Sequence, residues 1–104
     1  MLALAMNRLE NMIIGNKILK IVLIEDYIQI LFSNGSILNM YNDVAFSHQY
    51  QQYSNEIVED FVISDLLMCI KVDGKEISMG MKEDDYSTPE AFEFHSGDSE
   101  LIVG

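Results

Sequence analysis

The stretch Leu66-Leu-Met-Cys-Ile-Lys-Val-Asp73-Gly-Lys-Glu-Ile-Ser-Met-Gly-Met-Lys82 has the clearest folding pattern in the chain. Apolar residues alternate with other types on both sides of Asp73-Gly74, a dipeptide that favours a two-residue type I′ hairpin turn. Because side chains alternate along a strand, the apolar positions of both strands share one face and form cross-strand pairs. The pairs predicted for this core face are Met68 with Met79, Ile70 with Ile77 and Leu66 with Met81.

Two weaker hairpins are predicted, one on each side of this one. The strands predicted before it are residues 17–24, 27–32 and 36–42. Asn34-Gly35 supplies the positive φ angles of a tight turn between the last two of these strands. After it, residues 91–103 form a candidate hairpin, although Thr88-Pro89 also has the pattern of a helix start that would extend into residues 91–95.

The remaining segments are less regular. Residues 43–55 are predicted as a loop with or without a helical turn, and residues 57–63 as a further strand or an irregular edge. Residues 1–14 are predicted to be loosely ordered or to form a short helix. Short strands at this spacing predict a mainly β fold: one small antiparallel β-sandwich or curled sheet built from hairpins, with at most one or two short helices. A chain of 104 residues has the size of a single domain, residues 1–104.

The net charge excludes several kinds of partner. The chain carries 17 acidic and 6 basic residues, a formal net charge of -11, so it lacks the basic stripe that binds nucleic acid or an anionic membrane. The apolar run at residues 1–6 is shorter than the core of a secretory signal, and no run is long enough to span a bilayer. The lone Cys69 fits a reducing compartment. We therefore expect a cytoplasmic protein.

Most of the negative charge follows residue 55. Residues 56–104 contain thirteen acids and three bases, whereas residues 1–55 contain four acids and three bases. One interpretation is a solvated surface that keeps the protein in solution. The alternative is a surface that steers a basic protein partner and raises its association rate.

The sequence contains no recognisable catalytic or metal-binding motif. The candidate nucleophile or general bases are Cys69, His48 and His95, and a small enzyme built on them is the least favoured reading, since no local pattern joins them. Cys69 is predicted to be a small buried residue instead. The acidic clusters lack the alternating spacing of a calcium loop, so no metal and no cofactor are expected.

A resemblance to a known class of proteins adds a candidate function. Four segments resemble small bacterial proteins encoded beside polymorphic toxins: Gly15-Asn-Lys-Ile18, Glu25-Asp-Tyr-Ile-Gln-Ile-Leu-Phe32, Asn34-Gly-Ser-Ile-Leu38 and Asp85-Tyr-Ser-Thr-Pro-Glu-Ala-Phe-Glu-Phe94. These include the immunity proteins of contact-dependent growth inhibition systems. The resemblance implies a non-enzymatic protein that binds and neutralises a cognate toxin, in many cases a nuclease with a basic active-site cleft.

An acidic surface that covers such a cleft would draw on the strongly negative half of the chain. The alternative interpretation of each candidate is a solvated loop residue, because only a minority of interface residues contribute strongly to binding. Tyr53 and Tyr86 are included because tyrosine combines apolar area with a polar tip and is favoured at interfaces. The predicted partner-binding residues are Tyr53, Glu56, Glu59, Asp60, Glu83, Asp84, Asp85 and Tyr86. The alternative function is a general interaction or structural module that pairs through an exposed edge strand.

Overall fold

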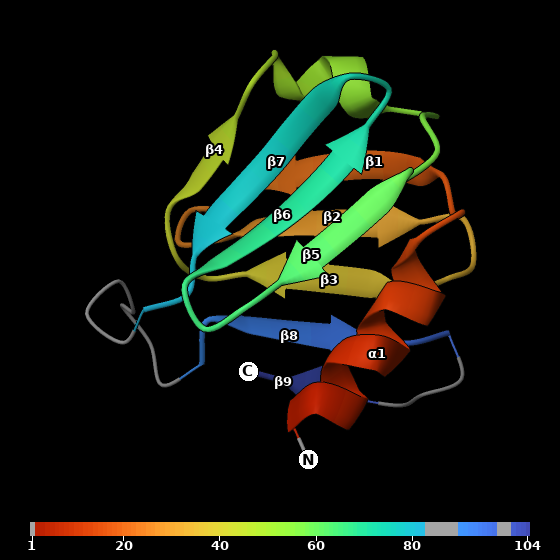
Figure 1. The fold of residues 1–104 in the computed structure, drawn as a ribbon. Helices are drawn as coiled ribbons and strands as arrows, with labels where there is room; N and C mark the ends of the chain where they lie inside the picture. Colours follow the sequence, from red (N-terminus) through yellow and green to blue (C-terminus); the bar gives the residue numbers. More distant parts are fainter. Residues whose placement is uncertain (1, 83–89, 98–100) are drawn as a thin grey trace.

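The computed structural model of residues 1–104 describes all of them except residues 1, 83–89 and 98–100, and for residues 2–7 it describes the backbone alone. Figure 1 shows one helix packed beside two layers of strands. The elements are α1 (Leu2–Ile13), β1 (Ile18–Leu23), β2 (Ile28–Phe32), β3 (Ile37–Met40), β4 (Val44–Phe46), the 3-10 helix η1 (Tyr50–Tyr53), β5 (Asp60–Ile63), β6 (Leu67–Val72), β7 (Lys75–Gly80), β8 (Phe92–His95) and β9 (Leu101–Val103).

The strands form two antiparallel sheets. One has the order β1-β2-β3-β8-β9 and the other the order β4-β7-β6-β5. In Figure 1 the four-stranded sheet lies in front of the five-stranded sheet, with its strands crossing those behind, and α1 continues this layer beside β5. The predicted mainly β, sandwich-like fold built from hairpins is confirmed.

The central hairpin has the predicted register. Met68 pairs with Met79 and Ile70 with Ile77, and the turn residues Asp73 and Gly74 have φ angles of 46° and 74°, as a type I′ turn requires. The prediction for Leu66 is wrong. The backbone of Leu66 does bond to Met81, but its side chain is 62% exposed, because β6 begins only at Leu67 and strand alternation does not extend beyond the strand.

The two outer hairpins also form. Ile30 pairs with Leu38 across the β2–β3 turn, where Gly35 has a φ of 86° and Asn34 does not adopt a positive φ. Only one left-handed residue is needed there because Phe32 N bonds to Ser36 O, which leaves a three-residue loop. At the end of the chain Phe94 pairs with Ile102, so the strand alternative holds for residues 92–95.

Other expectations have mixed outcomes. The short-helix alternative for the N-terminal segment is confirmed by α1, and the further strand within residues 57–63 is β5. The loop predicted for residues 43–55 contains η1, as one alternative allowed, but also β4, which sequence reasoning missed. Three residues are too few to show a strand period. The helix start at Thr88-Pro89 lies outside the described residues.

The buried apolar side chains form one continuous cluster. It joins Leu9 and Ile13 of α1 to Phe61 and Ile70 of the four-stranded sheet and to Phe94 of the five-stranded sheet. The inner faces of both sheets are thus covered, and what remains accessible is the outer face of each sheet. No helix in the described part of the chain is long and apolar enough to cross a bilayer.

Candidate functional site

The outer face of the four-stranded sheet is one of the two sheet faces that the fold leaves open. We define it as the side of β4-β7-β6-β5 that points away from the five-stranded sheet. Its residues occupy opposed positions on neighbouring strands. One cross-strand row contains Ala45, Ser78, Cys69 and Val62, and the next contains Glu76, Lys71 and Asp60.

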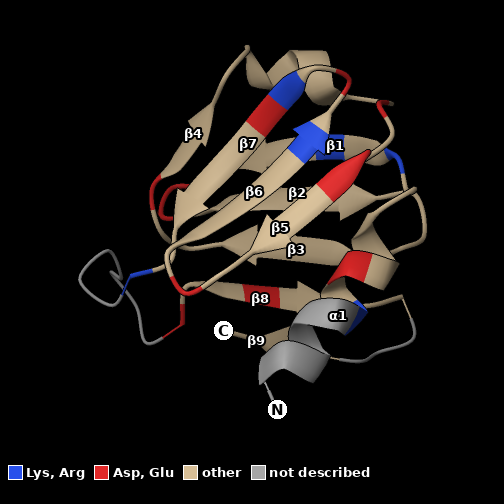
Figure 2. Ribbon diagram, in the orientation of Figure 1, with Lys and Arg blue, Asp and Glu red and all other residues tan. Residues whose placement is uncertain are grey.

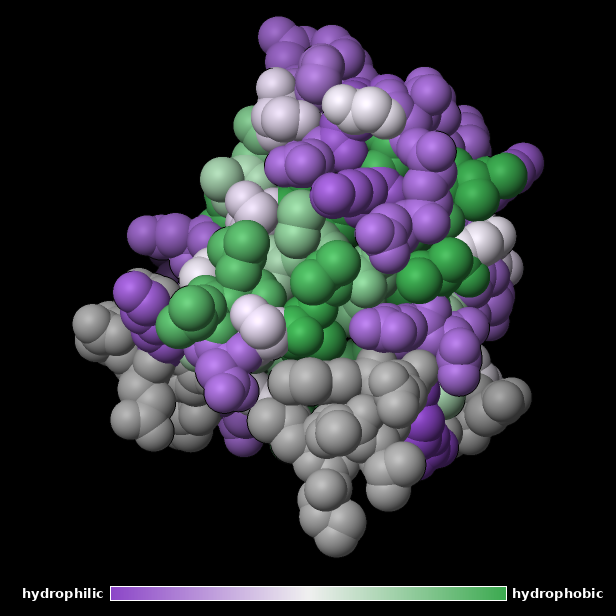
Figure 3. All heavy atoms as spheres, in the orientation of Figure 1, coloured by the Kyte–Doolittle hydropathy of each residue, from purple (hydrophilic) through white to green (hydrophobic). Residues whose placement is uncertain are grey.

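One half of this outer face is apolar. Val62 is 48% exposed, Leu67 is 46% exposed, and Leu66 extends the patch beyond the strand. Figure 3 shows hydrophobic side chains gathered across the middle of this face, with hydrophilic ones above them. Exposed apolar residues that form a contiguous patch, unlike scattered ones, are typical of interaction surfaces.

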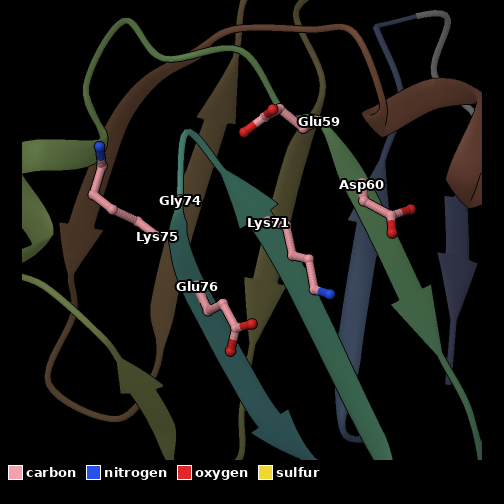
Figure 4. Close-up of a pocket in the computed structure, with 6 residues that line it drawn as sticks. All are labelled: Glu59, Asp60, Lys71, Gly74, Lys75 and Glu76. Atoms are coloured by element: carbon pink, nitrogen blue, oxygen red, sulfur yellow. The ribbon is translucent and has the colours of Figure 1, made fainter.

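The other half is charged and contains a shallow depression of about 200 Å³. In Figure 4 the Lys71 side chain lies between those of Asp60 and Glu76, whereas Lys75 extends away from them. The register that places Lys71 opposite Glu76 is as predicted, but no ion pair joins these two described residues within 4.0 Å. The lining residues are Glu59, Asp60, Lys71, Gly74, Lys75 and Glu76.

The structure brings together only part of the predicted binding set. Glu59 and Asp60 are exposed and lie side by side at the charged half of the outer face. Glu56 is half-buried and lies where its carbonyl oxygen accepts a hydrogen bond from Ile18 N, at the start of β1. Three further acids and one tyrosine of the set, Glu83, Asp84, Asp85 and Tyr86, lie outside the described residues.

Tyr53 is a core residue, and its prediction as a surface anchor is wrong. Its side chain is 0% exposed, and its ring packs 5.7 Å from that of Phe46. Its hydroxyl donates to Glu76 O at 2.7 Å and accepts from His48 N at 3.3 Å. A tyrosine can be fully buried when its hydroxyl finds such partners. Here the partner is the backbone of β7, 23 residues away along the chain.

The three candidate catalytic residues do not form one site. Cys69 lies on the outer face of the four-stranded sheet, whereas His95 belongs to the five-stranded sheet. His48 follows β4, and its ring nitrogen Nδ1 is hydrogen-bonded to the Ser47 hydroxyl. Cys69 is buried, as predicted, and burial raises the pKa of its thiol, with the charge of Glu76 adding to the shift. A raised pKa lowers the thiolate fraction and so disfavours a nucleophile.

A polar network that the sequence did not suggest lies on the five-stranded sheet. The Tyr41 hydroxyl donates to Glu93 Oε1 at 2.5 Å, and the same oxygen lies 3.7 Å from Nε2 of His95. Beside it the side chain of Gln29 donates to that of Asn39 at 3.0 Å. The network depends on the pairing of β3 with β8, which joins residues about 50 positions apart and has no local sequence pattern.

Replacing Tyr41 by phenylalanine should change how stability depends on alkaline pH. Burial, with the hydrogen bond to Glu93, raises the pKa of Tyr41 from its ordinary value of 10.0 to about 12. The folded state therefore holds the phenolic proton more tightly than the unfolded state. The resulting contribution to the free energy of unfolding is fully present below pH 10.0 and is lost as the pH rises towards about 12.

We expect Tyr41→Phe to be less stable than wild type at neutral pH by about 1 kcal/mol, because a partly exposed hydrogen bond is lost. The difference should shrink as the pH rises through this window. Urea unfolding of both proteins at a series of pH values would measure it. A difference that stays constant up to the highest pH would contradict the expectation.

The described residues contain no group of three or more His, Cys, Asp or Glu side chains placed to hold a metal ion. Comparison of the chain with protein-family models, curated protein sequences and solved structures finds no match. The function must therefore be argued from the surfaces themselves. The outer face of the four-stranded sheet, with its apolar and charged halves, is the candidate site.

Proposed function

We propose that this chain is a non-enzymatic immunity protein of the cytoplasm that binds a basic toxin domain, a nuclease, and covers its active-site cleft. The observation that carries the proposal is the outer face of the four-stranded sheet. Its apolar half exposes Val62 and Leu67 next to a charged half that contains Glu59 and Asp60. Protein interfaces commonly combine an apolar centre with a polar rim in this way.

The charges on the outer face contribute more to the alignment of a bound partner than to its affinity. The opposed row Asp60, Lys71, Glu76 alternates in sign across three strands, so a partner with the complementary order of charges would be favoured in one register over its neighbours. Long-range attraction of a basic domain comes from the net charge of -11. Charge of this kind raises association rates, while buried apolar contacts determine how slowly the complex dissociates.

The proposal is tested with the toxin domain encoded beside this chain. We expect the two proteins to copurify at moderate salt and this chain to rescue cells that express the toxin. We also expect Glu59→Lys to slow association several-fold at low salt and to have little effect at high salt, because salt screens exposed charges. Glu10→Lys makes the same charge change in α1, outside the charged half of the outer face, and is the control. Failure to bind together with failure to rescue would refute the proposal.

A second candidate, a module that pairs through an edge strand, is favoured by one observation. β1 is an edge strand of the five-stranded sheet. Among the described residues, Asn55 and Glu56 cover the start of its free edge through backbone hydrogen bonds to Ile18, and farther along Leu19 and Leu23 are 50% and 52% exposed. An unpaired edge with apolar side chains can add a strand from another chain. Sedimentation separates the two candidates, since edge pairing between copies makes the mass depend on concentration without any toxin present.

A further inference from the structure

A second concave site lies at one end of the sandwich, between two connections far apart in the sequence. The β1–β2 turn and the segment between β3 and β4 enclose a pocket of about 390 Å³. No sequence pattern had suggested a site here. The lining residues are Ile24, Glu25, Asp26, Tyr27, Ile28, Tyr41, Asn42, Asp43 and Val44.

The pocket is strongly acidic. Glu25, Asp26 and Asp43 supply three carboxylates, and its lining contains no lysine, arginine or histidine. Figure 2 shows the acidic turns of these two segments close to the start of β4. Three of the four acids of residues 1–55 thus share one place, although the net charge of that half of the chain is only -1. The net charge of a half of the chain does not show that these three carboxylates lie together.

Two tyrosines form an aromatic wall in the same pocket. The rings of Tyr27 and Tyr41 lie 5.3 Å apart at an angle of 58°. The hydrogen bond from the Tyr41 hydroxyl to Glu93 holds its ring in place. Aromatic faces attract cations, and a wall that is already ordered loses little side-chain entropy on binding.

Asn42 contributes a hydrogen-bond acceptor without a partner among the described residues to the lining of this pocket. It lines the pocket and is only 6% exposed. Its Nδ2 donates to Gly80 O at 2.7 Å, but its Oδ1 accepts no hydrogen bond from any described residue. A buried acceptor without a donor is unfavourable by about 1–3 kcal/mol. Because this oxygen has almost no exposed surface, the Asn42 side chain must shift before a donor bound in the pocket can reach it.

We propose that the pocket binds the guanidinium group of an arginine side chain from the protein partner. The inference rests on the proposed function and adds a defined contact to it. A guanidinium presents several N–H donors in one plane, so it can bond carboxylates and an amide oxygen while its face stacks on a tyrosine ring. A metal ion is also positively charged, but it fits the pocket less well. The described residues contain no group of three or more His, Cys, Asp or Glu side chains placed to hold one.

A hydrogen bond links the pocket to the end of the four-stranded sheet. Gly80, which accepts the hydrogen bond from Asn42, is the residue directly opposite Leu67 in the β6–β7 pairing. One partner can therefore cover the apolar half of the outer face and insert an arginine beside β4. The acidic pocket would set where that arginine sits, and hence the register of the complex.

The test uses the intact chain and a capped tripeptide, acetyl-Gly-Arg-Gly-amide, followed by amide chemical shifts. Peptides with citrulline or lysine in place of arginine separate charge from shape and guanidinium from ammonium. We expect weak, salt-sensitive binding of the arginine peptide with shifts at residues 24–28 and 41–44, weaker binding of the lysine peptide and none of the citrulline peptide.

Variants locate the contact. The double variant Glu25→Gln with Asp43→Asn should weaken arginine-peptide binding about tenfold or more, because two charge-assisted hydrogen bonds are lost. Glu10→Gln with Asp65→Asn removes the same charge at positions that line neither this pocket nor the depression on the outer face, and it should leave binding unchanged. The amide spectrum shows directly that each variant is folded.

Two results would overturn the inference: equal shifts with the citrulline peptide, or equal weakening by both double variants. Because no toxin is needed, the peptide result is separate from the copurification result. Copurification without peptide binding at this pocket rejects the arginine site alone. Peptide binding without copurification retains the site and rejects the toxin as partner.

Discussion

Tyr53→Ala is expected to lower the free energy of unfolding by about 3–5 kcal/mol, the usual range for removing a large buried ring. The side chain is 0% exposed and packs against Phe46. Its hydroxyl also bonds the backbone of β7. Small domains have a total stability of about 5–15 kcal/mol, so this one substitution removes a large share of it. Urea unfolding followed by circular dichroism measures the loss.

Tyr53→Phe separates the ring from the hydroxyl. It keeps the ring packing, and Glu76 O still accepts a hydrogen bond from Ser47 N, so we expect a loss of only about 1 kcal/mol. Gln52→Ala changes an exposed neighbour in η1 and should have little effect. If Tyr53→Ala were as stable as wild type but failed to bind the partner, Tyr53 would be a surface anchor after all.

Leu67→Asp is expected to weaken partner binding by about 30–100-fold, corresponding to the 2 kcal/mol or more that defines an interface hot spot. Leu67 is the first residue of β6, belongs to the apolar half of the outer face and is 46% exposed. Aspartate removes the apolar contact and leaves the acidic character of the chain intact. A loss of affinity would therefore be due to the apolar half of the outer face and not to the negative charge that attracts the partner. Isothermal calorimetry or surface binding with the toxin domain gives the affinity.

Leu101→Asp is the matched control for that measurement. Leu101 is also a leucine on a strand, is 54% exposed, and belongs to β9 of the other sheet. We expect it to bind like wild type. Equal losses at both positions would indicate a general effect on stability or on charge, and a loss confined to Leu101 would move the interface to the five-stranded sheet.

The sequence determined those parts of the fold in which the information is local. The hairpin at residues 66–82 was predicted to its register because Asp73-Gly74 leaves only one pairing that buries the alternating apolar residues. The mainly β class followed from several such turns. Exposure of Glu59 and Asp60 also followed, since charged residues in short segments seldom become buried.

Tertiary structure decided which residues meet across the chain. Tyr53 is a core residue because its hydroxyl can donate a hydrogen bond to a β7 carbonyl. The presence of a tyrosine in the sequence does not indicate whether its hydroxyl will bond to water or to the backbone. The acidic pocket arose because two turns about 15 residues apart converge at one end of the sandwich.

The burial of Tyr53 and the acidic pocket escaped prediction for one physical reason. Turn chemistry and side-chain alternation act over a few residues and are written in the sequence. Which strands become neighbours depends on how the whole apolar surface is buried at once, and that alone placed β8 against β3 and β4 against β7. The sequence thus specified the hairpins and the net charge, whereas packing of the two sheets decided where the charge and the exposed apolar residues form surfaces for a partner.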